Sequence, residues 1–193
     1  MATELAAPPL TYEDYRTIPD DRHRHEIVDG EEYVSSAPTT PQRRIVRRLL
    51  ISLSLHVEEQ GLGEVFDAPC DVLLSETDIV QPDVLFVAAE RSNIVKERGI
   101  EGAPDLIAEI VSEGNRRHDE IRTRKLDARH DVPEYWVVDP ALETVKVYRE
   151  PDGGYKRVAE WTAEHDDALS TPLLPDWSLP LKDLFRTASQ KNG

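Results

Sequence analysis

The chain has 193 residues, of which 39% are hydrophobic and 32% are charged, and it carries a net charge of −15. This length and composition are typical of one globular domain that buries about 70% of the surface its unfolded form exposes. The negative charge argues against indiscriminate binding to nucleic acid, so a nucleic-acid partner requires locally basic surfaces.

The sequence has no sign of a membrane or secreted location. No apolar run approaches the roughly 18 residues that cross a bilayer, and "MATELAAPPL" lacks the basic start and apolar centre of a signal peptide. Cys70 is the single cysteine, which excludes an intrachain disulfide and a cysteine-based zinc site. We therefore expect a cytoplasmic protein.

The first third of the chain predicts a short helix, a hairpin and a long helix. Thr11 is suited to cap a helix that ends near Pro19, and Asp29-Gly30 between two strand-like runs predicts a hairpin. Residues 38–60 have the spacing of an amphipathic helix. The side expected to be buried carries Ile45, Leu49, Ser52 and His56.

The rest of the chain alternates strand-like and helical segments. Strands are predicted over residues 64–69, 71–75, 79–87, 105–112 and 133–139. A charged helix is predicted over 115–131, a hairpin over 143–162 and a short helix over 181–185. This order indicates an α/β fold with a central mixed sheet flanked by helices. We expect a flexible arm over 1–10, a single domain over 11–186 and a tail over 187–193.

Two carboxylates stand in segments that otherwise have the composition of buried strands. Asp83 follows Pro82 in "IVQPDVLFV", and Glu109 lies in "DLIAEIVS". Burying an unpaired carboxylate costs several kcal/mol, and two carboxylates on neighbouring strands raise each other's pKa. A divalent cation removes both costs, so the pair indicates a metal site for phosphate chemistry. Each residue alone is also explained by local hydrogen bonds or a half-exposed strand edge.

Four segments carry a family resemblance. In order they are "HEIVDGEEYV", "QPDVLFVAAER", "GAPDLIAEIVS" and "DVPEYWVVDP". Their order and spacing resemble the Uma-type restriction-endonuclease-like family of the PD-(D/E)xK nuclease superfamily, over roughly residues 10–185. The resemblance implies a restriction-endonuclease-like core, DNA as the substrate and Mg²⁺ or Mn²⁺ as the cofactor.

The resemblance also implies roles for particular residues. Asp83 and Glu109, with the backbone carbonyl of Ile110, would hold the metal ion. Glu26 matches an acidic residue that the family carries near its N-terminus and would assist catalysis from the side. The alternative for Glu26 is a surface position beside the hairpin.

The catalytic lysine of the superfamily is displaced in this sequence. Its simplest position, two residues after the glutamate, is Val111. The family commonly places the lysine on the next helix, four residues after an aspartate, but Asp119 is followed at that spacing by Thr123. Lys125 lies two residues further on, about 200° around a regular helix, and is the candidate catalytic lysine.

Three further residues are candidates for binding substrate. Gln81 lies two residues before Asp83 and would share its strand face, where it would touch substrate or a metal-bound water, or satisfy local hydrogen bonds. Arg122 and Arg124 would supply positive charge to a phosphate, although arginine cannot act as a base at neutral pH.

The sequence leaves two functions open. The first is a metal-dependent endonuclease, and the second is a degenerate nuclease fold that binds a protein or nucleic acid without cleaving it, as the displaced lysine and the negative charge favour. Apolar residues in the segment 136–150 would support a homodimer. Turnover of a nucleic acid distinguishes the two functions, whereas metal binding alone does not.

Overall fold

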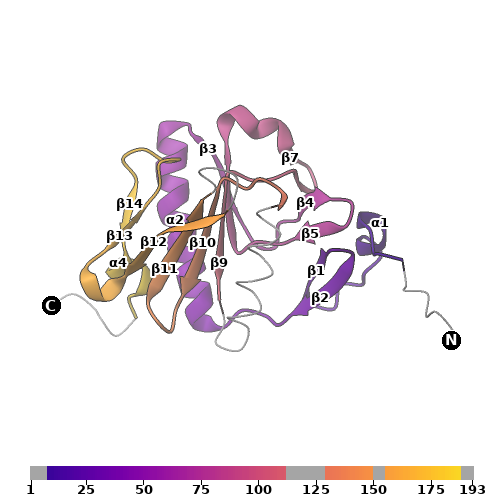
Figure 1. Ribbon diagram of the computed structural model, residues 1–193, viewed down its shortest axis with the longest axis horizontal. Helices are drawn as coiled ribbons and strands as arrows, with labels where there is room; N and C mark the ends of the chain where they lie inside the picture. Colours follow the sequence, from indigo (N-terminus) through magenta and orange to yellow (C-terminus); the bar gives the residue numbers. More distant parts are fainter. Residues whose placement is uncertain (1–7, 112–128, 150–154, 188–193) are drawn as a thin grey trace.

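The computed structural model describes residues 8–111, 129–149 and 155–187. Within these ranges, most strands form two six-stranded mixed sheets, and two more form a short third sheet (Figure 1). The predicted α/β class with mixed sheets and flanking helices is confirmed. The sequence predicted one central sheet, and the structure adds a second.

The first sheet has the strand order β2-β1-β5-β4-β8-β7. Its neighbours pair antiparallel except for β4 and β8, which run parallel. The strands are β1 (Arg24–Val28), β2 (Glu31–Ser35), β4 (Val72–Ser75), β5 (Asp78–Val80), β7 (Val95–Lys96) and β8 (Gly99–Glu101).

The second sheet has the order β12-β11-β10-β9-β6-β3, in which β9 and β10 form the parallel pair. Its strands are β3 (Gly63–Asp67), β6 (Val84–Ala88), β9 (Leu106–Ile110), β10 (Glu134–Asp139), β11 (Thr144–Arg149) and β12 (Lys156–Thr162). The third sheet pairs β13 (Ala168–Ser170) with β14 (Ser178–Pro180). The described helices are α1 (Tyr12–Tyr15), α2 (Thr40–Gln60), η1 (Ala89–Ile94), η2 (Ala163–His165) and α4 (Leu181–Phe185).

The second sheet forms the middle layer of the molecule, between α2 and the first sheet. Along β6, Val84 and Phe86 belong to the hydrophobic cluster that includes the buried side of α2. Leu85 and Val87 alternate with them and pack in the cluster shared with strands of the first sheet. Both faces of this sheet are therefore covered, which explains the near-continuous apolar runs in its strands.

Capping residues define both ends of helix α2. The Thr39 backbone N–H donates to Oε1 of Gln42 over 2.8 Å, which forms half of a capping box. Gly61 ends the helix in the left-handed conformation, with φ of 63°. The fully buried positions are Ile45, Leu49, Leu53 and Val57. Ser52 and His56, predicted on the buried side, are only half-buried, because the fully buried positions follow every fourth residue from Ile45 to Val57.

The N-terminal hairpin is confirmed. Asp29 and Gly30 have φ of 55° and 75°, which are the paired positive values of a tight hairpin turn. The turn connects β1 and β2 in the register that places His25 opposite Val34. The short helix after Thr11 is also confirmed, as α1.

The segment 79–87 is two strands, so the prediction of one continuous strand is wrong. β5 ends at Val80, β6 begins at Val84, and the two strands belong to different sheets. Pro82 lies in the connection, where its missing N–H disrupts no sheet hydrogen bond. The chain therefore passes from the first sheet to the second at residues 81–83, and Asp83 lies at the junction.

The apolar residues expected to support a homodimer are buried within the chain. All six residues of β10 are buried, and β11 packs beside it. Among the described residues of the segment 136–150, Leu142 is the exposed large hydrophobic residue. This segment therefore does not provide the expected apolar surface. Separately, no helix within residues 8–111, 129–149 and 155–187 is long and apolar enough to cross a membrane.

Asp78 joins three segments of the chain. Its buried carboxylate accepts hydrogen bonds from the Asp29 N–H (2.9 Å) and the Ser75 hydroxyl (2.8 Å), and lies 3.0 Å from Nε2 of His130. Burial raises the pKa of Asp78, but these partners outweigh it and hold the pKa below its ordinary value of 3.8.

Substitution of Asp78 by alanine is expected to reduce the free energy of unfolding by about 1–3 kcal/mol, because it leaves buried donors unpaired. Since the folded-state pKa is depressed, the contribution of the charge is present above pH 3.8 and is lost as the pH falls through the folded-state pKa. Urea unfolding at several pH values measures this effect, with the exposed Glu64→Ala as the control. Equal stability of Asp78→Ala and the wild type at pH 7 would refute it.

Candidate active site

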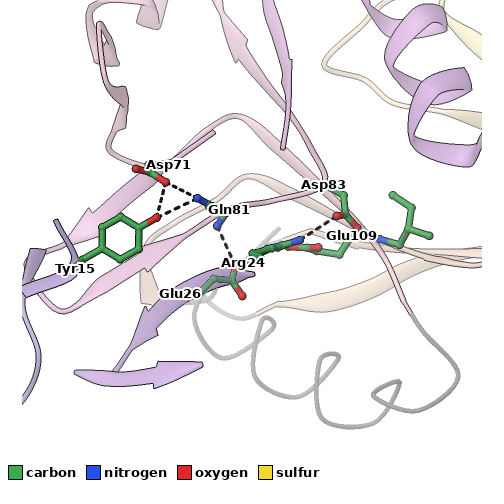
Figure 2. A network of polar contacts seen from close by, with 8 residues as sticks. Tyr15, Arg24, Glu26, Asp71, Gln81, Asp83 and Glu109 are labelled. Carbon is green, nitrogen blue, oxygen red and sulfur yellow. Dashed lines mark hydrogen bonds and ion pairs between the residues drawn. The ribbon is translucent and has the colours of Figure 1, made fainter. Parts of the chain in front are cut away.

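Three of the predicted carboxylates surround one guanidinium group (Figure 2). Nη1 of Arg24 lies 3.0 Å from Oδ1 of Asp83, and Nη2 lies 3.1 Å from Oε1 of Glu26 and 3.3 Å from Oε1 of Glu109. The three acidic side chains are only 2–16% exposed. Residues from β1, from the junction after β5 and from β9 thus meet at one buried point, which we call the carboxylate cluster.

The alternation of side chains along the strands explains this convergence. Leu85 and Val87 of β6 face the first sheet, as do Ile107 of β9 and Val111, which follows the end of β9. Counting in steps of two places Asp83 and Glu109 on the same face. β6 and β9 pair antiparallel with Val84 opposite Ala108, so one further step sets Asp83 beside Glu109.

The first sheet contributes the other half of the carboxylate cluster. Arg24 and Glu26 are two residues apart on β1 and therefore share a face. β1 pairs with β5, with Ile27 opposite Ile79, which brings it next to the junction at residues 81–83. The backbone N–H of Gln81 donates to Oε1 of Glu26 over 2.9 Å and ties β1 to the junction.

The two oxygens of the Asp83 carboxylate accept hydrogen bonds from different donors. Its Oδ2 accepts the backbone N–H of Ile110 over 2.8 Å, and its Oδ1 accepts from Arg24. Burial raises the pKa of Asp83, and the charge of Glu26 raises it further, whereas Arg24, the Ile110 N–H and a hydrogen bond with Glu109 oppose the rise. The net direction of the pKa is upward because burial is the largest of these effects.

Among the described residues, Arg24 is the cation that contacts all three acidic groups of the carboxylate cluster. Burial lowers the pKa of Arg24, but the charges of Glu109, Glu26 and Asp83 raise it above its usual value, so the guanidinium stays charged. Elsewhere, the buried Glu134 is fully satisfied by three protein donors, namely Trp136, Arg149 and Thr171. Glu134 therefore shows how protein donors alone hold a buried carboxylate in this fold.

Gln42 connects helix α2 to the segment beside the carboxylate cluster. Its Nε2 donates to the carbonyl oxygen of Ile110 over 3.1 Å, the oxygen predicted to be a metal ligand. Neither this contact nor that of Arg24 was predicted from the sequence. The capping-box spacing of Thr39 and Gln42 marks the start of the helix, but nothing local indicates a contact 68 positions away. For Arg24, the alternation with Glu26 was the available signal.

The oxygen atoms at the carboxylate cluster are of the chemical type that binds a hard divalent cation. Carboxylate oxygens and a main-chain carbonyl are the ligands that Mg²⁺ and Mn²⁺ prefer. Within the described ranges, however, no three acidic, histidine or cysteine side chains converge closely enough to hold an ion as they stand. The guanidinium of Arg24 contacts all three carboxylates, so a bound ion would compete with it for their oxygens.

The remaining predicted residues are placed differently. The side chain of Gln81 turns toward Tyr15 and Asp71, with its Nε2 3.0 Å from the Tyr15 hydroxyl and 2.8 Å from Oδ1 of Asp71 (Figure 2). The expected shared strand face with Asp83 is absent, because the strand is interrupted at this point. Arg122, Arg124 and Lys125 lie outside the described residues.

These observations define an α/β protein with a buried acidic cluster between its two large sheets. The model of the Uma2 family, described as "Putative restriction endonuclease", matches residues 12–182, and the chain belongs to this family. The resemblance noted in the sequence is thereby confirmed. Families of this restriction-endonuclease-like type generally use divalent metal ions and act on nucleic acid.

A solved structure shows the same fold. The crystal structure of a "putative nuclease belonging to DUF820" from Anabaena variabilis superimposes with a TM-score of 0.75 and 21% sequence identity. The match covers 92% of this chain and 98% of the other. At this identity the likeness establishes the fold alone. The comparison with curated proteins gave no match.

Proposed function

We propose that this protein is a metal-dependent endonuclease that hydrolyses DNA phosphodiester bonds. The observation that carries the proposal is the convergence of Asp83, Glu109 and Glu26 on one buried site. Membership of a restriction-endonuclease-like family supports it. In this proposal Asp83, Glu109 and the carbonyl of Ile110 hold Mg²⁺ or Mn²⁺.

The protein groups would have distinct tasks. The Ile110 N–H fixes one oxygen of Asp83, so that the other points into the carboxylate cluster. Glu26, held by the Gln81 N–H, would orient the attacking water from the side. When bound, the metal ion lowers the pKa of water and shields developing charge on the phosphate. Lys125, or Arg122 or Arg124, would stabilise the phosphate.

The test is a cleavage assay on supercoiled plasmid, single-stranded DNA and RNA, with Mg²⁺ or Mn²⁺ and with chelator. We expect nicking of DNA with metal, none with chelator, and loss of nicking in Glu109→Gln. Arg157→Gln, which breaks an exposed ion pair with Glu160, is the control that should remain active. A folded protein that cuts none of the three substrates with either ion would overturn the proposal.

One observation favours a second candidate, a module that binds nucleic acid or protein without cleaving it. Arg24 already contacts all three carboxylates, and a fixed guanidinium can serve as their permanent counter-ion. Val111 at the usual lysine position favours this function too. Under it, no nucleic acid would be cut, whether or not the protein binds either ion.

A further inference from the structure

A second polar pocket lies next to the carboxylate cluster, at the other end of Gln81. Its volume is about 580 Å³, within the roughly 300–1,000 Å³ of pockets that bind small ligands. It is formed by α1, by the chain leading into β1, by the loop before β4 and by the turn between β7 and β8. The residues that matter for its chemistry are Tyr12, Tyr15, Asp71, Gln81 and Arg98.

Two tyrosines give the pocket an aromatic wall. The rings of Tyr12 and Tyr15 have centroids 6.3 Å apart and planes inclined by 18°, and both side chains remain partly exposed. Flat aromatic faces of this kind stack on nucleobases, largely without regard to which base it is.

The floor of the pocket offers hydrogen-bond acceptors. The Tyr15 hydroxyl donates to Oδ1 of Asp71 over 2.7 Å, and Nε2 of Gln81 donates to both groups. Among the described residues, Oδ2 of Asp71 and Oε1 of Gln81 are left without a hydrogen bond. A pair of open acceptors matches the amino edge of adenine, cytosine or guanine.

The rim of the pocket offers positive charge. Arg98 is exposed, and none of the described residues forms an ion pair with it. Arg16 also lines the pocket but is paired with Glu13 at 3.1 Å. Because Asp71 repels a phosphate, the phosphate belongs beside Arg98 and the base beside Asp71.

Gln81 connects this pocket to the carboxylate cluster. Its carboxamide lines the pocket, while its backbone N–H donates to Glu26 (Figure 2). We propose that the pocket binds one unpaired nucleotide adjacent to the scissile phosphate, with the base against Tyr12 and Tyr15 and the phosphate at Arg98. This inference rests on the proposed nuclease function and names its substrate as single-stranded or locally unpaired DNA, because a base inside a duplex cannot enter a pocket.

The test is binding of a fluorescent single-stranded 12-mer and of its duplex, measured by anisotropy in chelator so that no cleavage occurs. We expect tighter binding of the single strand, and roughly tenfold weaker binding of it by Tyr12→Leu and by Arg98→Gln. Duplex binding should not change. Tyr33→Leu and Arg157→Gln, which lie outside the pocket, are the matched controls, and thermal unfolding verifies that each variant is folded.

The two proposals can fail separately. Equal affinity for both oligonucleotides, or unchanged single-strand binding by both folded pocket variants, would overturn the pocket assignment even if metal-dependent cleavage is observed. Selective binding of the single strand that both variants lose would support the pocket assignment, even if no cleavage is observed. In that case the nuclease proposal alone would be overturned.

Discussion

Replacement of Arg24 by glutamine is expected to destabilise the metal-free protein by about 3–5 kcal/mol, the usual cost of removing one partner from a buried ion pair. The reason is that Glu26, Asp83 and Glu109 lose the cation that all three contact. Urea unfolding in chelator measures the loss. Arg157→Gln, which breaks an exposed pair, should change stability by no more than about 1 kcal/mol.

Divalent metal is expected to restore much of the stability that Arg24→Gln loses. An ion that binds only the folded state at 100 times its dissociation constant adds about 2.7 kcal/mol, and the vacated position leaves the three carboxylates to the ion. Mg²⁺ or Mn²⁺ should therefore raise the unfolding temperature of Arg24→Gln more than that of the wild type. If Arg24→Gln is as stable as the wild type in chelator, the guanidinium is not the counter-ion of these carboxylates.

Replacement of Asp83 by asparagine is expected to reduce cleavage by at least about 100-fold. Loss of one charged ligand removes several kcal/mol of charge stabilisation, and each 1.36 kcal/mol corresponds to tenfold in rate. Asparagine retains an oxygen for the Ile110 N–H, but its amide nitrogen replaces the oxygen that accepts from Arg24. Because Arg24 keeps Glu26 and Glu109 as partners, the variant should fold and lose no more than about 1–3 kcal/mol of stability.

Rates of plasmid nicking and urea unfolding of the same preparations measure the two effects of Asp83→Asn. Asp67→Asn, at an exposed position of β3, is the matched control. If Asp83→Asn cleaves DNA at the wild-type rate, Asp83 takes no part in the reaction. If the variant does not fold, Asp83 has a structural role instead.

The features that sequence reasoning placed correctly depend on short-range patterns. The hairpin follows from Asp29-Gly30, which supplies the two positive φ values. The long helix follows from its apolar spacing and its caps. The position of Glu109 within an apolar strand was readable because β9 is covered on both faces, so a carboxylate stands out against its neighbours.

The features that were missed depend on long-range packing. The break at residues 81–83 was hidden because β5 and β6 are both apolar, and only their separate sheets reveal it. Arg24 reaches Asp83 and Glu109 across 59 and 85 positions. Nothing near β1 in the sequence predicts which strand faces it, so the contacts of Arg24 with these carboxylates and the pocket beside Gln81 were not predicted.

The central claim is that the carboxylate cluster is a site for a divalent cation, and direct titration with Mn²⁺ tests it. Free Mn²⁺ is followed by electron paramagnetic resonance for the wild type and for Asp83→Asn. We expect one bound ion per wild-type chain and at least tenfold weaker binding by the variant. Equal binding by both proteins, or no binding by the wild type at millimolar Mn²⁺, would contradict the claim.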